Sequence, residues 1–144
     1  KKLNLSFKDT RKQGEHIIVS EPTNDAAKYY NLENWTNKTI SEIKKYSDRK
    51  IIRHNRNSAT PLSELLNNAW AFVSDHSSAG FKCMIEGIPS YFTNQTLQKI
   101  SKISEIEESK IKHSIFNNLA YGQWTLEEIY NGTAWSYVST ELNA

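Results

Sequence analysis

Two polar segments of the chain carry residue types that suit the binding of a phosphate group. The first segment holds basic side chains: Arg53, His54 and Arg56. The second holds a histidine, small hydroxyl residues and a glycine: His76, Ser77, Ser78, Ala79 and Gly80. Guanidinium groups present forked donors that match phosphate oxygens, and an imidazole adds a further donor. The sequence therefore predicts an anion site built from these two segments.

The second segment is expected to lead into a helix. Free backbone amides at the start of a helix attract anions, and the helix dipole adds to this attraction. Ser77 and Ser78 would add hydroxyl donors, and Gly80 would permit a close approach of the backbone. The serines could equally serve only as helix N-caps, and arginines near a strand end are often simply solvated. Both structural alternatives stay open at this point.

Other catalytic patterns fit the sequence less well. Asp75 and His76 precede two serines, which invites comparison with a hydrolase triad. Neighbours on an extended turn are expected to point in different directions, however, and the nucleophile-elbow pattern is absent, so no catalytic residue is assigned. The histidines are too dispersed along the chain for a recognised zinc spacing, and no metal is predicted. Cys83 lies in an expected helix, where a buried structural thiol is the usual outcome.

Short apolar runs and amphipathic segments alternate along the chain, and they must position these groups. Apolar runs typical of strands buried on both faces of a parallel sheet occupy residues 16–20, 49–54, 70–74 and 88–92. Helical spacing or helix signals occupy residues 35–46, 61–69 and the stretch before Gly87, which is expected to end its helix. This order predicts right-handed crossovers and an α/β fold, a Rossmann-like parallel sheet of about four strands with flanking helices.

The two ends of the chain have a different pattern. Residues 1–15 are polar with alternating apolar positions, which suits an edge strand or an arm. Helices are expected over residues 97–104, 110–120 and 125–130, and the last of these begins with a capping-box-like threonine and glutamate. We interpret residues 1–144 as a single Rossmann-like domain with an α/β core over residues 16–93 and a helical tail over residues 94–144.

Composition bounds the class of protein. A length of 144 residues suits one domain, and 38% hydrophobic with 11% aromatic residues excludes a disordered chain. No apolar run approaches the roughly 18 residues that cross a bilayer, so no membrane span is predicted. The single cysteine, Cys83, cannot form an internal disulfide, and a cytoplasmic location is expected. Because the chain begins at Lys1, we expect that it could belong to a longer polypeptide.

Charge is unevenly distributed along the chain. The total of 18 basic and 16 acidic side chains, a net charge of +2, is too balanced to predict nucleic-acid binding. Between Lys44 and Arg56, however, six basic residues accompany one acid, Asp48, which gives a local charge of six minus one, or +5. This basic run indicates an anion nearby. Nucleic-acid binding is the least favoured alternative, and it would show a steep salt dependence.

Residues 69–89, AWAFVSDHSSAGFKCMIEGIP, resemble the nucleotide-sugar-binding segment of GT-B glycosyltransferases. In that family an apolar strand, a small-residue loop with serines, a helix that often carries glutamate and a Gly-x-Pro strand start occur in this order. Residues 53–56 are similar to the basic strand-end segment of bacterial capsule and lipopolysaccharide sugar transferases. The resemblance covers residues 17–92, and residues 122–135 are more weakly similar to the end of bacterial and phage proteins of this kind.

This resemblance assigns roles to individual residues. It implies that Ser77 and Ser78 bind the donor phosphates. It also implies that Arg53 and Arg56 balance the phosphate charge and that Glu86 lies near the ribose or the sugar. GT-B enzymes have two Rossmann-like lobes, so the resemblance implies that this chain is the C-terminal lobe and that an acceptor lobe precedes it. A nucleotide sugar is then the donor substrate, and no separate cofactor is implied.

Two departures from the family pattern leave the donor open. Asp75 and His76 stand where Thr-Asn is usual, and Asn55 follows His54 where the family has proline. The sequence therefore predicts a donor-binding domain that helps to move a sugar from an activated nucleotide to a glycan or another acceptor. The alternative is a non-catalytic nucleotide- or glycan-binding module that recruits a partner. Turnover with a nucleotide sugar would separate the two.

Overall fold

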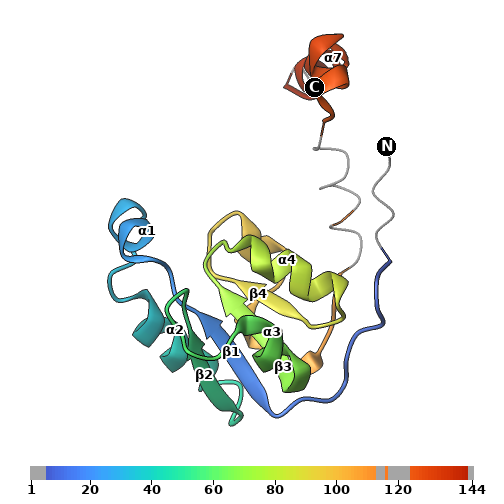
Figure 1. Cartoon of the computed structure of the whole chain (residues 1–144). Helices are drawn as coiled ribbons and strands as arrows, with labels where there is room; N and C mark the ends of the chain where they lie inside the picture. Colours follow the sequence, from blue (N-terminus) through green and yellow to red (C-terminus); the bar gives the residue numbers. More distant parts are fainter. Residues whose placement is uncertain (1–5, 113–115, 117–123, 143–144) are drawn as a thin grey trace. The chain divides into compact units, whose positions relative to one another are not determined.

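A computed structural model describes residues 6–112, 116 and 124–142 of the chain. The chain divides into two compact units, residues 1–111 and residues 112–144. The first unit holds a four-stranded parallel sheet in the order β2-β1-β3-β4, shown in Figure 1. The strands are β1 (His16–Ser20), β2 (Lys50–His54), β3 (Ala69–Ser74) and β4 (Ser90–Phe92). The predicted α/β class and the Rossmann-like parallel sheet are confirmed.

Short helices connect these strands. They are α1 (Asn24–Tyr29), α2 (Trp35–Ile43), α3 (Leu62–Leu65), the 3-10 helix η1 (Leu66–Asn68) and α4 (Ser78–Ile85). Helix α4 ends as expected, because Gly87 adopts a φ of 82° just beyond its C-cap. Ala69, predicted to end the helix before it, is instead the first residue of β3. Helix α1 was not predicted, because it buries none of its residues and so leaves no apolar pattern.

The strands are buried on both faces, which explains their continuous apolar runs. Ile17 and Val19 point to one face, where they pack with residues of α2 and of the 3-10 helix η3 (Ile103–Glu108). Ile18 and Phe72 point to the opposite face, which α3 and α4 cover (Figure 1). Side chains alternate across a strand, so one run supplies both cores. Each such fully buried side chain contributes about 1.5–3 kcal/mol of transfer free energy.

The strand order creates a switch point between β1 and β3. The chain leaves β1 through α1 and α2 to reach β2 on one side, and it then returns through α3 to add β3 on the other side of β1. Helix α2 covers one face of the sheet, whereas α4, which follows β3, covers the other. The connections after β1 and β3 therefore diverge. In open α/β sheets, ligands bind in the crevice that this divergence leaves at the carboxyl ends of the strands.

Residues 6–14 form an arm and not an edge strand, whereas residues 1–5 of the same predicted segment lie outside the described residues. The backbone N–H of Lys8 donates to the carbonyl of Ile85 at 2.9 Å, and that of Arg11 donates to the carbonyl of Gly87 at 2.7 Å. The arm thus bonds to the end of α4 and does not pair with a strand of the sheet. Of the two alternatives that the sequence left open, the arm is confirmed.

Gly14 is where the arm passes closest to the sheet. A Cβ atom at this position would lie 2.5 Å from the backbone nitrogen of Trp70 and 2.6 Å from the carbonyl carbon of Ala69. We expect Gly14→Ala to lower the free energy of unfolding by about 1–3 kcal/mol, since the backbone of the arm or of β3 must move. Urea denaturation measures this loss. Gln13→Ala, an exposed neighbour in the same arm, is the control and should be neutral; equal stability of both variants would contradict the close approach.

The segment after β4 differs from the sequence-based expectation. Instead of an α-helix over residues 97–104, it forms the 3-10 helix η2 (Leu97–Lys99) and then η3. Lys102 is extended between them, and the buried Ser101 hydroxyl donates to the carbonyl of Ser90 at 2.7 Å. This break places Ile106 fully inside the first core. Packing against the sheet therefore overrides a continuous helix.

The second unit contains α6 (Leu126–Tyr130) and α7 (Thr133–Leu142). The predicted capping box is confirmed, because the Thr125 side chain accepts from the backbone N–H of Glu128 and the Glu128 carboxylate accepts from the backbone N–H of Thr125. Most of the helix predicted over residues 110–120 lies outside the described residues. Among the helices of the described ranges, none has the length and apolar character needed to cross a membrane.

Candidate functional site

A cavity of about 430 Å³ lies at the carboxyl edge of the sheet, at the switch point between β1 and β3. The connections after three parallel strands line it: residues 20–23 after β1, residues 54–56 after β2 and residues 74–79 after β3. Ala26 of α1 and Leu62 of α3 complete the wall. A cavity of this size is in the range that binds small organic ligands.

The loop from β3 into α4 supplies the hydroxyl-rich wall of the cavity. Ser77 is the N-cap of α4, and its side chain accepts from the backbone N–H of Ala79 at 3.3 Å. The Ser74 hydroxyl in turn accepts from the backbone N–H of Ser77 at 3.3 Å. Ser78, the first helical residue, is exposed and lines the cavity. Ser77 thus serves the capping role that the sequence left open, whereas Ser78 is an exposed residue of the cavity wall.

The loop after β2 supplies the basic wall. His54 ends β2, and Arg56 follows two residues later; both line the cavity. A tight turn holds this loop, since the Asn55 backbone N–H donates to the Ser58 hydroxyl at 2.9 Å and the Asn55 carbonyl accepts from the backbone N–H of Ser58 at 3.1 Å. Within the described part of the chain, Arg56 makes no ion pair. Its guanidinium is therefore available to a ligand.

Arg53 does not line the cavity; it is paired with Glu21, which sequence reasoning missed. Its guanidinium donates to Glu21 Oε1 from Nε at 2.8 Å, and Glu21 Oε2 accepts from the Asn55 side chain at 3.0 Å. Burial raises the pKa of Glu21, but the hydrogen bonds from Asn55 and Arg53 and the Arg53 charge outweigh burial, so the pKa lies below its usual value. Glu21 thus lies in the cavity wall as a carboxylate whose negative charge is balanced by the Arg53 guanidinium.

Asp75 and His76 contact each other directly, which corrects the expectation that these neighbours point apart. The His76 Nδ1 atom lies 2.7 Å from Asp75 Oδ2. The other Asp75 oxygen, Oδ1, accepts from the hydroxyl of Thr93 at 2.7 Å. A bent loop, in place of an extended one, lets the two side chains meet, because Asp75 to Ser77 turn toward the start of α4.

Besides Arg53, two further predicted site residues lie away from the cavity wall. Gly80 is buried inside α4, where a Cβ would lie 2.7 Å from the Phe92 ring, and its carbonyl accepts from the Ser90 hydroxyl at 2.8 Å. Glu86 is the C-cap of α4, at the opposite end of the helix from Ser78, and it pairs with Lys8 of the arm. The hydrogen bond from Lys8 and its charge lower the pKa of Glu86. Gly80 is thus a packing residue beside the Phe92 ring, and Glu86 binds the arm and not the cavity.

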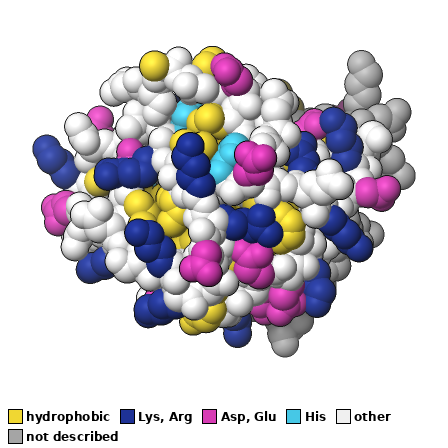
Figure 2. Space-filling view, turned by 90° about the horizontal axis from the view of Figure 1, so that it is seen from below, with side chains coloured by type: hydrophobic (Ala, Val, Ile, Leu, Met, Phe, Trp, Pro, Cys, Tyr) yellow, Lys and Arg dark blue, Asp and Glu magenta, His cyan; other side chains and the backbone are white. Residues whose placement is uncertain are grey.

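Half of the bases in the run over residues 44–56 pair with acidic residues of the protein. Lys45 pairs with Glu42, Arg49 with Glu107 and Arg53 with Glu21. On the face shown in Figure 2, Lys and Arg side chains are interspersed with Asp and Glu and do not form one basic surface. Three of the six bases therefore have an acidic partner, which weakens the case for a nucleic-acid site here.

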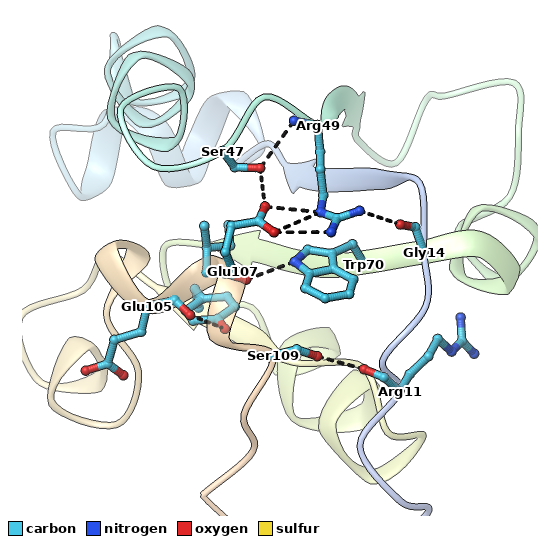
Figure 3. Close-up of polar contacts among 10 residues, drawn as sticks. Arg11, Gly14, Ser47, Arg49, Trp70, Glu105, Glu107 and Ser109 are labelled. Atoms are coloured by element: carbon cyan, nitrogen blue, oxygen red, sulfur yellow. Dashed lines mark hydrogen bonds and ion pairs between the residues drawn. The ribbon is translucent and has the colours of Figure 1, made fainter.

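A second cavity, of about 440 Å³, is lined by Tyr46, Ser47, Asp48, Arg49 and Glu107. Two of its charged groups, Arg49 and Glu107, bind each other, as Figure 3 shows. Arg49 donates from Nε to both Glu107 oxygens at 3.1 and 3.2 Å, and its guanidinium carbon lies 3.7 Å from the centre of the Trp70 ring. The Ser47 hydroxyl also donates to Glu107. This cluster joins η3 to the rest of the unit and has a structural role.

Cys83 is buried in α4, as the sequence predicts, and burial raises the pKa of its thiol to about 12. A thiol with so high a pKa is a poor nucleophile. Across residues 6–112, 116 and 124–142, no three His, Cys, Asp or Glu side chains gather where they could hold a metal ion. The polar and titratable side chains that could bind a ligand lie instead around the cavity at the switch point.

The cavity gathers six of the nine predicted site residues: His54, Arg56, His76, Ser77, Ser78 and Ala79. It adds Glu21 and Asp75, which were not predicted to contact a ligand. Glu21 and Asp75 are each the first residue after a strand, and residues at the carboxyl ends of parallel strands are the ones that contact ligands. Their position after a predicted strand could therefore have identified them from the sequence.

Comparisons with protein-family models, with curated proteins and with solved structures found no match to this chain.

Proposed function

We propose that the chain is the donor-binding lobe of a GT-B-like glycosyltransferase and that its cavity binds the phosphates of a nucleotide sugar. The observation that carries this proposal is the position of the cavity. It lies at the carboxyl edge of a parallel sheet, at the switch point, between the start of α4 and the guanidinium of Arg56, which has no ion pair with any residue that the structure describes. Nucleotides bind at this place in open α/β sheets.

The electrostatics of the cavity favour an anion. The N-terminus of α4 carries roughly half a positive charge, and the exposed Ser78 adds a hydroxyl donor beside it. Arg56 adds a full charge from the facing loop. Glu21 would repel a phosphate, but Arg53 neutralises it through contacts of 2.6–2.8 Å. Arg53 thus supports the site by balancing a carboxylate and not by touching the ligand.

The same groups suit the chemistry of sugar transfer. When an acceptor oxygen attacks the anomeric carbon, the bond from that carbon to the phosphate oxygen breaks, and its electron pair stays on the phosphate. Preorganised donors at the start of α4 and on Arg56 would stabilise this growing charge. A preceding lobe would bind the acceptor and would supply the group that removes its proton.

The proposal is tested by the thermal stabilisation that nucleotide sugars produce. We expect one of UDP-glucose, GDP-mannose, ADP-glucose or CMP-sialic acid to raise the melting temperature, with about 2.7 kcal/mol of stabilisation at 100 times its Kd. Arg56→Ala should weaken binding by about tenfold or more, because a charge-assisted hydrogen bond is lost. Lys50→Ala removes the same charge from the opposite end of β2 and is the matched control.

Three outcomes separate the candidate functions. Stabilisation that Arg56→Ala weakens and Lys50→Ala does not supports the donor site. Binding at this site without sugar transfer in the longest chain that contains this unit favours the non-catalytic binding module. No stabilisation by any of the four nucleotide sugars, or an equal loss in both variants, contradicts the proposal.

A further inference from the structure

A chain of hydrogen bonds runs from the first core of the sheet to the cavity. The indole N–H of Trp35 in α2 donates to the hydroxyl of Thr93 at 2.6 Å. The Thr93 hydroxyl donates to Asp75 Oδ1 at 2.7 Å, and Asp75 Oδ2 lies 2.7 Å from Nδ1 of His76. Trp35 is 7% exposed, the Asp75 side chain 11% and the His76 side chain 37%. This series of hydrogen bonds thus begins at Trp35 in the protein interior and ends at His76 in the cavity wall.

The Trp35 indole fixes which group donates and which accepts in each of these hydrogen bonds. An indole N–H can only donate, so the Thr93 oxygen accepts from Trp35. The single hydroxyl hydrogen of Thr93 is then left for Asp75 Oδ1, which must accept it. A carboxylate can only accept, so with Asp75 as the acceptor toward both partners the hydrogen between Asp75 Oδ2 and His76 belongs to Nδ1. A neutral His76 consequently carries its hydrogen on Nδ1 and a bare lone pair on Nε2.

The His76 ring is also held from outside the chain of hydrogen bonds. The Tyr30 ring, just beyond the end of α1, meets it edge-on, with ring centres 4.6 Å apart and an interplanar angle of 64°. His76 lines the cavity together with Ser77 and Ser78. Nδ1 is occupied by Asp75, so Nε2 is the ring nitrogen that remains for a ligand.

We propose that His76 takes up one proton at Nε2 when a phosphate binds and donates it as a hydrogen bond to a phosphate oxygen. This inference rests on the proposed phosphate site. A bare lone pair repels a phosphate oxygen, whereas an imidazolium attracts it, and the Asp75 carboxylate stabilises the imidazolium. Asp75, Thr93 and Trp35 are positioning residues, because they act through His76 and do not touch the ligand.

Proton uptake makes binding depend on pH. Above the pH at which the free imidazole loses its proton, affinity should fall by about tenfold per pH unit. The other charged or titratable groups at the cavity are His54, Arg56 and Glu21, and Tyr30 packs on the His76 ring. Of these, His54 is the other imidazole. The experiment must therefore separate His76 from His54.

The probes are sulfate and UDP-glucose, since a phosphomonoester itself titrates near pH 6 and would obscure the result. Affinity for each is measured between pH 5.5 and 8.5, and the proton count comes from calorimetry in buffers of different ionisation enthalpy. We expect uptake approaching one proton per sulfate at the upper end of this range. His54→Gln should retain that uptake, and His76→Gln should abolish it.

Asp75→Asn gives the sharpest readout. The Asn oxygen would still accept from Thr93, but its amide group would donate to His76 Nδ1, so that neutral His76 carries its hydrogen on Nε2. This variant should bind sulfate with no proton uptake and a flat pH profile. Nitrogen-15 NMR of the imidazoles should show the Nδ1–H form of His76 in the native protein and the Nε2–H form in the variant.

The possible failures are distinguishable. Failure of both sulfate and UDP-glucose to bind at any pH would overturn the proposed phosphate site and this inference with it. Binding without proton uptake, or uptake that His54→Gln removes, would overturn the role of His76 alone and leave the phosphate site standing. An Nε2–H form of neutral His76 in the native protein would also overturn the inference, independently of any ligand.

Discussion

Replacing Trp70 with alanine should lower the free energy of unfolding by about 3–5 kcal/mol, the usual cost of removing a buried aromatic side chain. Trp70 is 8% exposed and belongs to the core between the sheet, α2 and η3. Its indole N–H donates to the carbonyl of Ile106 at 2.9 Å, and the Arg49 guanidinium covers its ring (Figure 3). The substitution therefore leaves a cavity, an unpaired carbonyl and a displaced guanidinium together.

Urea denaturation followed by circular dichroism measures this loss. A domain is stable by about 5–15 kcal/mol, so the variant should lose a large share of the total. Trp135→Ala is the matched control, because Trp135 of α7 is 71% exposed and its removal should change stability by about 0.5 kcal/mol or less. Trp70→Phe, which keeps a ring beneath Arg49 but loses the N–H, should fall between them. A Trp70→Ala variant within about 1 kcal/mol of the native protein would contradict the role of this cluster.

Replacing Ser78 with glutamate should weaken phosphate binding strongly while leaving the fold intact or slightly more stable. Ser78 is exposed, begins α4 and lines the cavity, and the first turn of α4 has no acidic residue. A carboxylate at a helix N-terminus stabilises the helix by about 0.3–1 kcal/mol. The same carboxylate would repel a phosphate, and loss of the helix-start contact and the added repulsion should weaken binding by about 50-fold or more.

Opposite changes in stability and binding make this variant informative. The melting temperature without ligand and the ligand-induced shift are measured on the same sample. Ser78→Ala is the control for loss of the hydroxyl alone, and it should weaken binding by about tenfold or less. If Ser78→Glu bound the nucleotide sugar as tightly as the native protein, the ligand would not contact the start of α4.

The architecture was predictable because a parallel strand that is buried on both faces requires a continuous run of apolar residues. Residues 16–20 and 70–74 have this pattern, and both are strands within one residue of the prediction. Segments whose structure depends on a few tertiary contacts were not predictable. Ser101 turns the chain through a hydrogen bond to β4, and this contact, which has no periodic signal, replaces the helix expected over residues 97–104.

The candidate site was predictable where position along the chain decides it. Ser77 and Ser78 follow β3, and Arg56 follows β2, so topology alone brings them to one edge of the sheet. Pairings between side chains were not predictable in this way. Arg53 lies within β2 and reaches Glu21 instead of a ligand, and Glu86 lies at the far end of α4. Residue type suggested a phosphate ligand for Arg53, and the family resemblance suggested a sugar or ribose near Glu86. In the structure, Arg53 instead pairs with Glu21, and Glu86 pairs with Lys8.

Mapping the ligand on the backbone amides of the first unit is the most direct test of the phosphate site. The measurement is a titration of nitrogen-15-labelled protein with whichever of the four nucleotide sugars stabilises it, or with UDP-glucose if none does. The expected result is a set of saturable shifts centred on the amides of residues 54–56 and 76–79, with little change at residues 46–49, which line the second cavity. Shifts centred on the second cavity, or no saturable shifts, would contradict a phosphate site at the switch point of the sheet.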